Sequence, residues 1–309
     1  SLKDMQDARS VTETLGMPYH IFHYENLFRD EVIEPFVACY ERGETPNPCI
    51  ECNRCFKFQH LYKEMEELGC DVLVTGHYAQ VVFDEGKNLW QLRKAVDPAK
   101  DQSYVLYTLT QEQLAHTRFP LGGLTKERAR EIAEENGFVN AKKHDSQDIC
   151  FVPDGDYVSF MERFRKRAYP EGDFLDKEGN VMGRHKGYVH YTIGQRKGLG
   201  IAYSHPLYVI DIRPEDNTVI LGTNEDLFHT RLTARNVNII SGEAFDAPRK
   251  VLAKIRYRHT EQPATAYMEG DRLIVEFDEP QRAITRGQAV VLYDGDEVLG
   301  GGVICQPCD

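Results

Sequence analysis

The sequence predicts an N-terminal α/β domain with a parallel sheet, a small central domain and a C-terminal β-barrel. In the first domain, an apolar run at residues 71–82 follows an amphipathic helix, and this succession is typical of a parallel α/β sheet. Further along, a basic helix at 157–167 gives way to strands interrupted by glycines. From residue 233 onward, short apolar runs alternate with turns, a spacing typical of a small closed barrel. We therefore expect three domains, covering residues 1–150, 151–230 and 231–309.

Amphipathic spacing predicts the helices of the first domain. Apolar residues recur along one face at 4–16 and 31–42, and again from Phe58 to Leu68, where Gly69 follows in the position of a C-cap. Thr125 is expected to cap another helix, with Gly137 past its end. Further strands are expected at 89–96, 187–200, 207–212, 218–221, 237–240, 251–257, 265–268, 273–277 and 289–293.

Composition limits the class of protein. The chain has 309 residues, 28% of them charged and 41% hydrophobic, which describes a folded protein with more than one core. No apolar run is long enough to cross a membrane, and no signal-peptide core follows Ser1, so we expect a cytoplasmic protein with no membrane partner. In that compartment the eight cysteines are expected to be core residues, catalytic thiols or metal ligands rather than structural disulfides.

The net charge of −12 disfavours nucleic acid as a partner, but the distribution of charge matters more than its sum. Basic residues gather in four short stretches, two of which include an aromatic residue. Solvated faces would explain any one of them, whereas four together favour a phosphate-contacting surface. The stretches are 163–167, 184–186, 196–197 and 254–259.

A cysteine loop at residues 45–58 is the main chemical signal. Pro46 and Pro48 oppose a helix before Cys49, and the helical spacing resumes near Asn53. Cys49 and Cys52 are therefore expected on a rigid loop that enters a helix, a position that lowers a thiol pKa. Cys150 lies in a second polar loop, and we expect the two loops to meet and carry out sulfur chemistry.

The other thiols allow more than one interpretation. Cys39 and Cys70 are expected to be small core residues. The spacing Cys49-x-x-Cys52-x-x-Cys55 could hold zinc or an iron–sulfur cluster, with Cys305-Gln-Pro-Cys308 as a second pair. Those two groups lie far apart in the chain, unlike the pairs of an ordinary zinc ribbon.

Six blocks of the sequence, in this order, resemble the tRNA-uridine 2-sulfurtransferases, the tRNA-specific 2-thiouridylase family. The first is Thr45-Pro-Asn-Pro-Cys-x-x-Cys-Asn-Arg-x-x-Lys-Phe58, followed by Thr75-Gly-His-Tyr-Ala79 and Lys100-Asp-Gln-Ser-Tyr104. The others are Ser146-Gln-Asp-Ile-Cys-Phe151, the glycine-rich stretch 187–198 and Lys254-Ile-Arg-Tyr-Arg258. The resemblance covers essentially the whole chain. It implies a PP-loop ATP-pyrophosphatase domain, a central tRNA-binding domain and a C-terminal β-barrel.

The resemblance also implies a reaction. Using ATP with Mg²⁺, an enzyme of this family adenylates the C2 oxygen of the wobble uridine in tRNA and replaces that oxygen with sulfur. Cys150 matches the cysteine that carries the sulfur as a persulfide. Cys52 matches the cysteine that either attacks as nucleophile or helps to release sulfide, and then closes a disulfide with Cys150. The implied partners are tRNA and a sulfur donor, either a cysteine desulfurase or a sulfur-relay protein.

Other roles follow from the same resemblance, position by position. Gly76 is expected to contact the nucleotide, with His77 beside it. Within the run at 71–82, both also lie at the turn that ends the expected buried strand, where open α/β sheets bind ligands. Asn47, Pro48 and Cys49 are expected to border the target base. Contacts with tRNA are expected from Lys100, Asp101, Gln102, Arg256, Tyr257 and Gln288.

The family's Ser-Gly-Gly-x-Asp-Ser motif, which forms the pyrophosphate cradle, is not found in this sequence, and the resemblance places Ser1 beyond it. A chain that begins at Ser1 is expected neither to bind ATP in the family's way nor to complete the sheet. Two further hypotheses stay open beside the ATP-dependent enzyme. One is a catalytically dead tRNA-binding fragment. The other is a thiolase that uses free sulfide on an iron–sulfur cluster held by Cys49, Cys52 and Cys150, since three thiolates leave one iron open.

Overall fold

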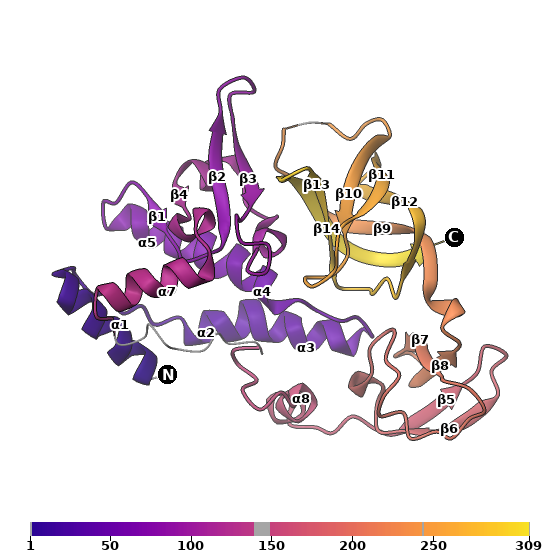
Figure 1. Ribbon diagram of the computed structural model, residues 1–309. Coiled ribbons are helices and arrows are strands. Elements are labelled where there is room, and N and C mark those ends of the chain that lie inside the picture. The colour runs from indigo at the N-terminus through magenta and orange to yellow at the C-terminus, as the bar shows by residue number, and fades with distance from the viewer. Residues whose placement is uncertain (1, 139–148, 243, 309) are drawn as a thin grey trace.

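A computed structural model describes residues 2–138, 149–242 and 244–308, and it confirms the predicted fold class (Figure 1). The chain starts with helices, continues through a small sheet and ends in a barrel. The helices are α1 (Leu2–Leu15), α2 (Glu25–Phe28), α3 (Glu34–Glu41), α4 (Pro48–Glu51), α5 (Leu61–Glu67), α6 (Gln111–Ala115), α7 (Lys126–Glu135) and α8 (Tyr157–Arg165). Two π-helical segments, η1 (Arg29–Ile33) and η2 (Cys52–His60), join α2 to α3 and α4 to α5.

The N-terminal part contains a parallel strand pair. β1 (Leu73–Val74) pairs with β4 (Thr117–Arg118), with Leu73 opposite Thr117. The run at 71–82 was expected to be a buried strand running into a turn at Gly76. The turn is present, but the strand before it is only β1 and its Val74 is exposed, so the expected length and burial are wrong. After the turn the chain enters an antiparallel hairpin of β2 (Ala79–Asp84) and β3 (Leu89–Lys94). The turn is held by Gln102, whose side chain accepts from the Tyr78 N–H at 2.9 Å.

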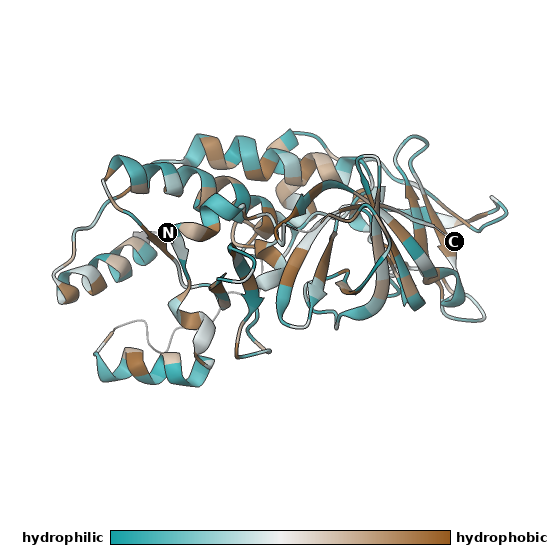
Figure 2. Cartoon of the chain, turned by 90° about the horizontal axis from the view of Figure 1, so that it is seen from above, coloured by the Kyte–Doolittle hydropathy of each residue, from teal (hydrophilic) through white to brown (hydrophobic). Residues whose placement is uncertain are grey.

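The C-terminal part is a closed six-stranded barrel. Its strands follow the order β13-β10-β11-β12-β9-β14, and pairing of β13 with β14 closes the ring. Closure leaves no strand edge within the ring. Hydrophobic and hydrophilic residues alternate along the strands (Figure 2), as expected where one side of each strand faces a core. The bounds are β9 (Phe228–Ile239), β10 (Arg249–Lys254), β11 (Gln262–Glu269), β12 (Arg272–Arg282), β13 (Ala289–Asp294) and β14 (Glu297–Cys308).

The central part holds a four-stranded sheet with the order β6-β5-β8-β7. The strand predicted at 187–200 is wrong: one short turn, η5 (Tyr188–His190), is followed by a loop. Positive φ angles at Gly194, Gly198 and Gly200 explain the difference, because an extended strand requires negative φ. The observed strands are β5 (Gly172–Leu175), β6 (Val181–His185), β7 (Tyr208–Arg213) and β8 (Thr218–Gly222).

Glu41, at the end of α3, joins the N-terminal and central parts. Its carboxylate accepts from Arg165 Nη2 at 2.9 Å, from Arg167 Nη2 at 2.7 Å and from the Tyr169 hydroxyl at 2.9 Å. The Tyr188 hydroxyl also donates to the Glu41 carbonyl oxygen at 2.9 Å. Arg165 and Arg167 of the basic stretch at 163–167 therefore take part in an ion-pair network with Glu41, while the phosphate contact expected of this stretch stays a prediction.

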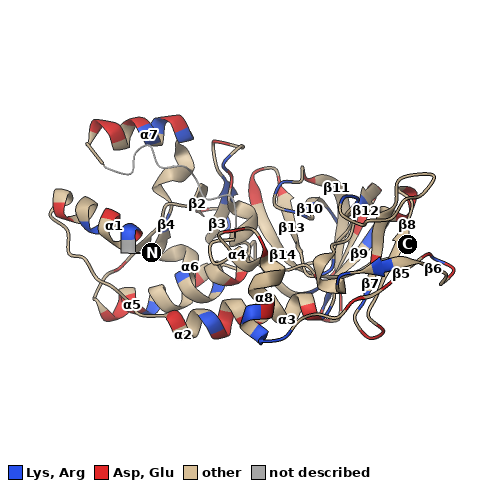
Figure 3. Cartoon of the chain, turned by 90° about the horizontal axis from the view of Figure 1, so that it is seen from below, with Lys and Arg blue, Asp and Glu red and all other residues tan. Residues whose placement is uncertain are grey.

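Charge is mixed along the helices as well. α7 carries acidic and basic residues together (Figure 3), and Arg128 pairs there with Glu131 and Glu135. In the described part of the chain, no helix has the length and apolar character that crossing a membrane requires.

Replacing Glu41 with Gln should destabilise the protein by about 1–3 kcal/mol, because the partly buried Arg165 and the exposed Arg167 both lose a charged partner, and Arg165 keeps only Glu34. Burial alone would raise the pKa of Glu41, but the bonds from Arg165, Arg167 and Tyr169 outweigh it and lower the pKa. The stabilisation should therefore be complete above the unfolded carboxyl pKa of about 4.3 and disappear as pH falls through the lower folded value.

Urea denaturation at pH 7 and at lower pH measures this effect. Glu13→Gln is the matched control. The Glu13 side chain is 73% exposed and pairs with Arg9, so this ion pair should contribute less than about 0.5 kcal/mol to stability. Equal losses in the two variants would contradict the role assigned to Glu41.

Candidate active site

The cysteine loop leads into a helix that starts earlier than predicted. Asn47 caps it by accepting from the Cys49 N–H at 3.2 Å, and Pro48 occupies the first position, where a missing N–H costs nothing. The predicted start near Asn53 is therefore wrong. Cys49 lies exposed in the first helical turn, and Cys52 is half-buried where η2 begins.

The π-helical form of η2 brings a cation to the thiols. A π-helix bonds residue i to residue i+5, which places Lys57 on the same face as Cys52. Lys57 lowers the pKa of both Cys49 and Cys52 through its charge. Sequence reasoning quoted Lys57 within its motif but gave it no role, because a regular α-helix would turn it away from Cys52.

Cys150 comes to the same place from the second loop. Its side chain is exposed, and its charge raises the pKa of both Cys49 and Cys52, so the three sulfur atoms lie within electrostatic range of one another. The predicted meeting of the two loops is therefore seen. The neighbouring acidic residues Asp145 and Asp148 lie outside the described residues.

The environment nevertheless opposes the thiolate in the free protein. Desolvation has the largest influence on the pKa values of Cys49 and Cys52, and it raises both. The neighbouring thiols raise them further. The predicted lowering by the helix N-terminus is thus outweighed. Each of the seven cysteines whose side chains are described is a free thiol, Cys52 and Cys150 included.

Phe151 fixes the position of Cys150. Its ring makes edge contacts with Phe28 and Phe36, at centroid distances of 5.7 Å and 5.2 Å. Cys52 packs against the same cluster of apolar side chains. Both thiols therefore lie at one aromatic cluster. Cys52 packs against it directly, and Cys150 directly precedes Phe151, which belongs to it. Sequence reasoning missed Phe151 as a positioning residue, although it directly follows the cysteine.

His77 is a buried neutral base beside Lys57. Its Nε2 is 3.1 Å from Lys57 Nζ and its Nδ1 is 2.7 Å from Thr75 Oγ1. Because an ammonium group can only donate, we assign Nε2 as acceptor and place the proton on Nδ1. Burial and then the Lys57 charge lower the pKa of His77 to about 3, so the ring is neutral at physiological pH.

Gly76 lies between Thr75 and His77, just past the carboxyl end of β1, where α/β sheets bind ligands. A Cβ added at Gly76 would meet only Leu121, at 3.7 Å. The backbone there is open to a close approach, which fits a nucleotide. The predicted contact of Gly76 with the nucleotide stays a prediction.

Of the residues Lys100 to Gln102, Gln102 holds this turn and Asp101 holds the backbone of Ala95. The Asp101 carboxylate accepts from the Ala95 N–H at 2.9 Å and from the Ser103 hydroxyl at 2.7 Å. Gln102 holds Tyr78, as described above. Asp101 and Gln102 therefore have internal roles that the sequence did not reveal, while their predicted contacts with tRNA stay predictions.

The barrel holds the cysteine loop from the other side through contacts that we call the loop clamp. Gln288 Nε2 donates to the carbonyl oxygens of Thr45 and Pro46 at 2.9 and 3.2 Å, and the Thr45 N–H donates to Arg286 O at 2.8 Å. Arg235 pairs with the buried Glu44 carboxylate at 3.0 Å. The Gln288 amide thus faces the loop, a role that sequence reasoning missed; its predicted tRNA contact stays a prediction.

The residues Arg256 and Tyr257 follow β10 near the same site. Arg256 Nη2 donates to the Arg282 carbonyl oxygen at 3.1 Å. The side chain of Tyr257 is 38% exposed. Burial raises the pKa of its phenol most, and the charges of Asp101 and Cys49 raise it further. An exposed aromatic ring therefore lies near Cys49, the residue predicted to border the target base.

The donor geometry does not fit a metal centre. In the described ranges, no three His, Cys, Asp or Glu side chains are grouped so that they could hold a metal ion. Cys49, Cys52 and Cys150 belong to those ranges, so their arrangement gives no support to an iron–sulfur cluster. Cys70 is exposed, contrary to its predicted core position, whereas Cys39 is buried as predicted.

The fold and the site define a class of protein with three parts: an α/β part, a small central sheet and a closed barrel. In it, two loops bring thiols together near the carboxyl end of a parallel strand pair. The family model described as tRNA methyl transferase HUP domain matches residues 1–154. The tRNA methyl transferase PRC-barrel domain matches residues 158–223, and the aminomethyltransferase beta-barrel domain matches residues 229–304.

Three relatives named tRNA-specific 2-thiouridylase MnmA are similar over nearly the whole chain. The protein of Clostridioides difficile strain 630 is 49% identical over 305 residues, covering 98% of this chain and 84% of that protein. The protein of Acetivibrio thermocellus is 47% identical, with 98% and 85% covered, and that of Carboxydothermus hydrogenoformans is 48% identical, with 98% and 84% covered. The chain belongs to the tRNA-specific 2-thiouridylase family, and the resemblance found in the sequence is confirmed.

Replacing Lys57 with Met should raise the pKa of Cys52 further, because the cation that favours its thiolate is lost. Alkylation of Cys52 by iodoacetamide, followed by mass spectrometry across pH, should show its midpoint at higher pH. Lys63→Met is the control, since Lys63 lies on the same continuous helix but pairs with Glu67 in solvent. A midpoint that does not move in Lys57→Met would contradict the assigned role.

Proposed function

We propose that this protein is an ATP-dependent tRNA-uridine 2-sulfurtransferase that replaces the C2 oxygen of the wobble uridine with sulfur. The observation that carries the proposal is the convergence of Cys52 and Cys150 from separate loops, in a chain of the 2-thiouridylase family. Two thiols in reach of each other can carry a sulfur atom, resolve the bond that held it and be reset by an external dithiol.

ATP, accompanied by Mg²⁺, would supply activation by making the C2 oxygen part of an AMP leaving group, with release of pyrophosphate. The pyrophosphate would be held by the family's Ser-Gly-Gly-x-Asp-Ser motif, which is not among these 309 residues. Gly76 would contact the nucleotide, with its open backbone as support. His77, neutral and fixed by Thr75 and Lys57, would lie beside it as an uncharged hydrogen-bonding group, because its low pKa prevents it from carrying a proton as an acid at pH 7.

Sulfur would arrive on Cys150 as a persulfide, and two routes lead to product. In one, the terminal sulfur attacks C2, AMP leaves, and Cys52 then attacks the Cys150 sulfur, so that the S–S bond breaks and the electron pair stays on the new thiocarbonyl sulfur. In the other, Cys52 attacks Cys150 first and releases sulfide, which attacks C2. Both routes end in a Cys52–Cys150 disulfide, which an external dithiol must reduce with two electrons.

The tRNA would lie between the cysteine loop and the barrel. Asn47, Pro48 and Cys49 would border the flipped base, and the exposed Tyr257 ring near Cys49 is placed to stack on it. Base stacking on aromatic side chains is a usual mode of recognition for unpaired RNA. Further contacts would come from Lys100, Asp101, Gln102, Arg256 and Gln288.

The exposed position of Cys150 supports delivery of sulfur by another protein, a cysteine desulfurase or a sulfur-relay protein, in the cytoplasm. The alternatives have less support. A catalytically dead tRNA-binding protein has no need for paired thiols beside a lysine. An iron–sulfur thiolase needs a donor group that the described residues do not form.

Radiolabelled sulfur on the full-length protein, together with 2-thiouridine in tRNA, tests the two thiols separately. Cys150→Ser should abolish both persulfide loading and product, because no other exposed thiol lies in the second loop. Cys52→Ser should still load sulfur but form no product, because the resolving thiol is lost. Cys70→Ser, an exposed thiol away from the cluster, should retain both activities.

Two outcomes would refute the assignment. Stable label on Cys52 in the Cys150→Ser variant would reverse the two roles. Full thiolation activity in either single variant would overturn the two-thiol mechanism itself.

A further inference from the structure

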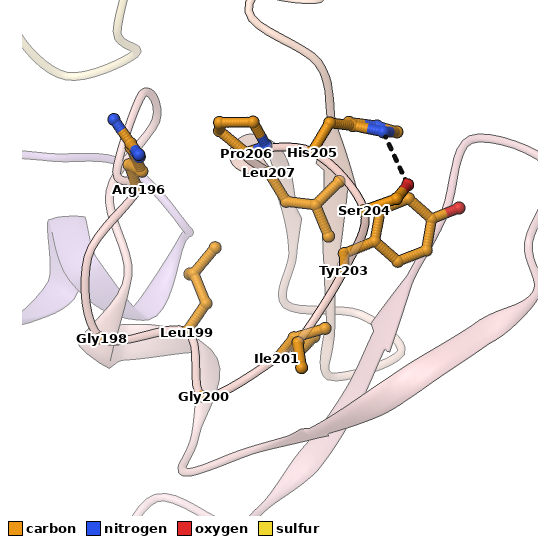
Figure 4. Close-up of a pocket in the computed structure, with 11 residues that line it drawn as sticks. Arg196, Gly198, Leu199, Gly200, Ile201, Tyr203, Ser204, His205, Pro206 and Leu207 are labelled. Atoms are coloured by element: carbon orange, nitrogen blue, oxygen red, sulfur yellow. Dashed lines mark hydrogen bonds between the residues drawn. The ribbon is translucent and has the colours of Figure 1, made fainter.

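A pocket of about 720 Å³ lies in the central part, away from the thiols and within the loop that precedes β7 (Figure 4). The sequence had marked this glycine-rich stretch as a phosphate-binding candidate, and the thiolation site does not use it. The residues that bear on its chemistry are Arg196, Leu199, Ile201, Tyr203, His205 and Leu207.

The rim of the pocket is pre-organised. The Gln195 side chain accepts from the Thr192 N–H at 3.1 Å and donates to the Lys197 carbonyl oxygen at 3.0 Å. The backbones of Gln195 and Gly194 are both bonded to Val209 on β7, at 3.0 and 2.8 Å. The turn that presents Arg196 and Lys197 is therefore tied to the sheet.

Arg196, which lines the pocket, and its chain neighbour Lys197 are not neutralised. Among the residues that the structure describes, none forms an ion pair or hydrogen bond with the guanidinium group of Arg196 or the ammonium group of Lys197. Elsewhere in the central part, Arg184 pairs with Asp173 at 3.0 Å and Lys177 pairs with Asp226 at 2.7 Å. Two unpaired cations on a rigid turn are suited to a phosphate group.

The opposite wall offers an aromatic surface. The side chain of Tyr203 is 56% exposed. Its ring packs edge to face on the His205 ring, with 4.8 Å between the ring centroids. Figure 4 shows Arg196 across the pocket from Tyr203, with Leu199 and Ile201 below them. Leu199 and Leu207 are buried in the core of the central part, so the pocket has a firm apolar floor. An exposed ring opposite free cations is the pattern of a site for an unpaired nucleotide.

We propose that this pocket binds a nucleotide of the tRNA that is splayed out of a loop or an unpaired end. Its phosphate would lie against Arg196 and Lys197, and its base would stack on Tyr203 above the apolar floor. The inference rests on the proposed function, because it takes tRNA as the substrate. It adds a second contact, in a different part of the chain from the thiols, that grips the tRNA away from the reacting base.

Binding of tRNA measured against salt concentration tests the proposal. Tyr203→Ala should weaken binding by about 5- to 100-fold, the usual effect of removing one stacked base, while Tyr203→Phe should bind like the wild type because the ring remains. The double variant Arg196→Ala, Lys197→Ala should make the slope of log affinity against log salt shallower by about 1 to 2. Lys177→Ala, on the same sheet but already paired, should leave the slope unchanged.

The outcomes separate this inference from the function it rests on. Wild-type affinity and slope in both Tyr203→Ala and the double variant would overturn the pocket as a tRNA site, while thiolation by the wild-type protein would still stand. Equal loss in Tyr203→Phe and Tyr203→Ala would overturn stacking. Competition by AMP that is seen in the wild type and lost in Tyr203→Ala would overturn the assignment to tRNA in favour of a free nucleotide. Failure of the wild-type protein to bind tRNA at all would instead refute the proposed function.

Discussion

The thiol site depends on the ion pair between Glu44 and Arg235. The Glu44 carboxylate is almost fully buried, and Arg235 Nη2 donates to both of its oxygens at 3.0 Å, while Arg42 adds a further bond at 3.0 Å. Burial would raise the pKa of Glu44, but the two arginines outweigh it and keep the carboxylate charged. Removing one partner of such a pair costs about 3–5 kcal/mol when both are buried, and less here because Arg235 is one-third exposed. The pair therefore requires the barrel to be present where the cysteine loop begins.

This requirement gives the cysteine loop its shape. Next to Glu44, the bonds from Gln288 and to Arg286 fix the backbone of Thr45 and Pro46, and the helix starts two residues later. The thiols of Cys49 and Cys52 thus take their positions from a barrel that is remote in sequence. Lys57 then couples two features of the site: it favours the thiolates with its charge and keeps His77 neutral by donating to it. Lys57 thus acts on both groups in addition to burial, which is the larger influence on each pKa.

Local features of the chain could be predicted from the sequence. Pro46 and Pro48 indicated the rigid loop, the short apolar runs after residue 233 indicated the barrel, and the two cysteine loops were expected to meet. The predictions that failed depended on contacts with distant segments or on the exact position of a residue in a helix, which a local pattern does not carry. The helix start was placed too late because a proline at the first position was read as a helix breaker. The turn at Gly76 was expected, but the strand before it was expected to be longer and buried, because its pairing with β4 depends on a segment distant in sequence.

The loop clamp itself was out of reach of the sequence, since Glu44 and Arg235 are separated by 191 positions and each is an ordinary charged residue by itself. The ion pairs of Arg165 and Arg167 were also out of reach of the sequence, because their partner Glu41 lies on another helix. The order of family motifs located Cys52, Cys150 and His77, but it said nothing of why a π-helical turn is needed to bring Lys57 beside them.

The barrel, through the loop clamp, is expected to place Cys52 where it can react with Cys150. The most direct measurement is the rate at which a Cys52–Cys150 disulfide forms under limiting oxidant, followed by mass spectrometry in the wild type and in Arg235→Met. Arg128→Met, which breaks an exposed ion pair on α7, controls for the loss of a surface charge. The account predicts that the disulfide forms readily in the wild type and in the control and several-fold more slowly in Arg235→Met. Equal rates in all three proteins would contradict it.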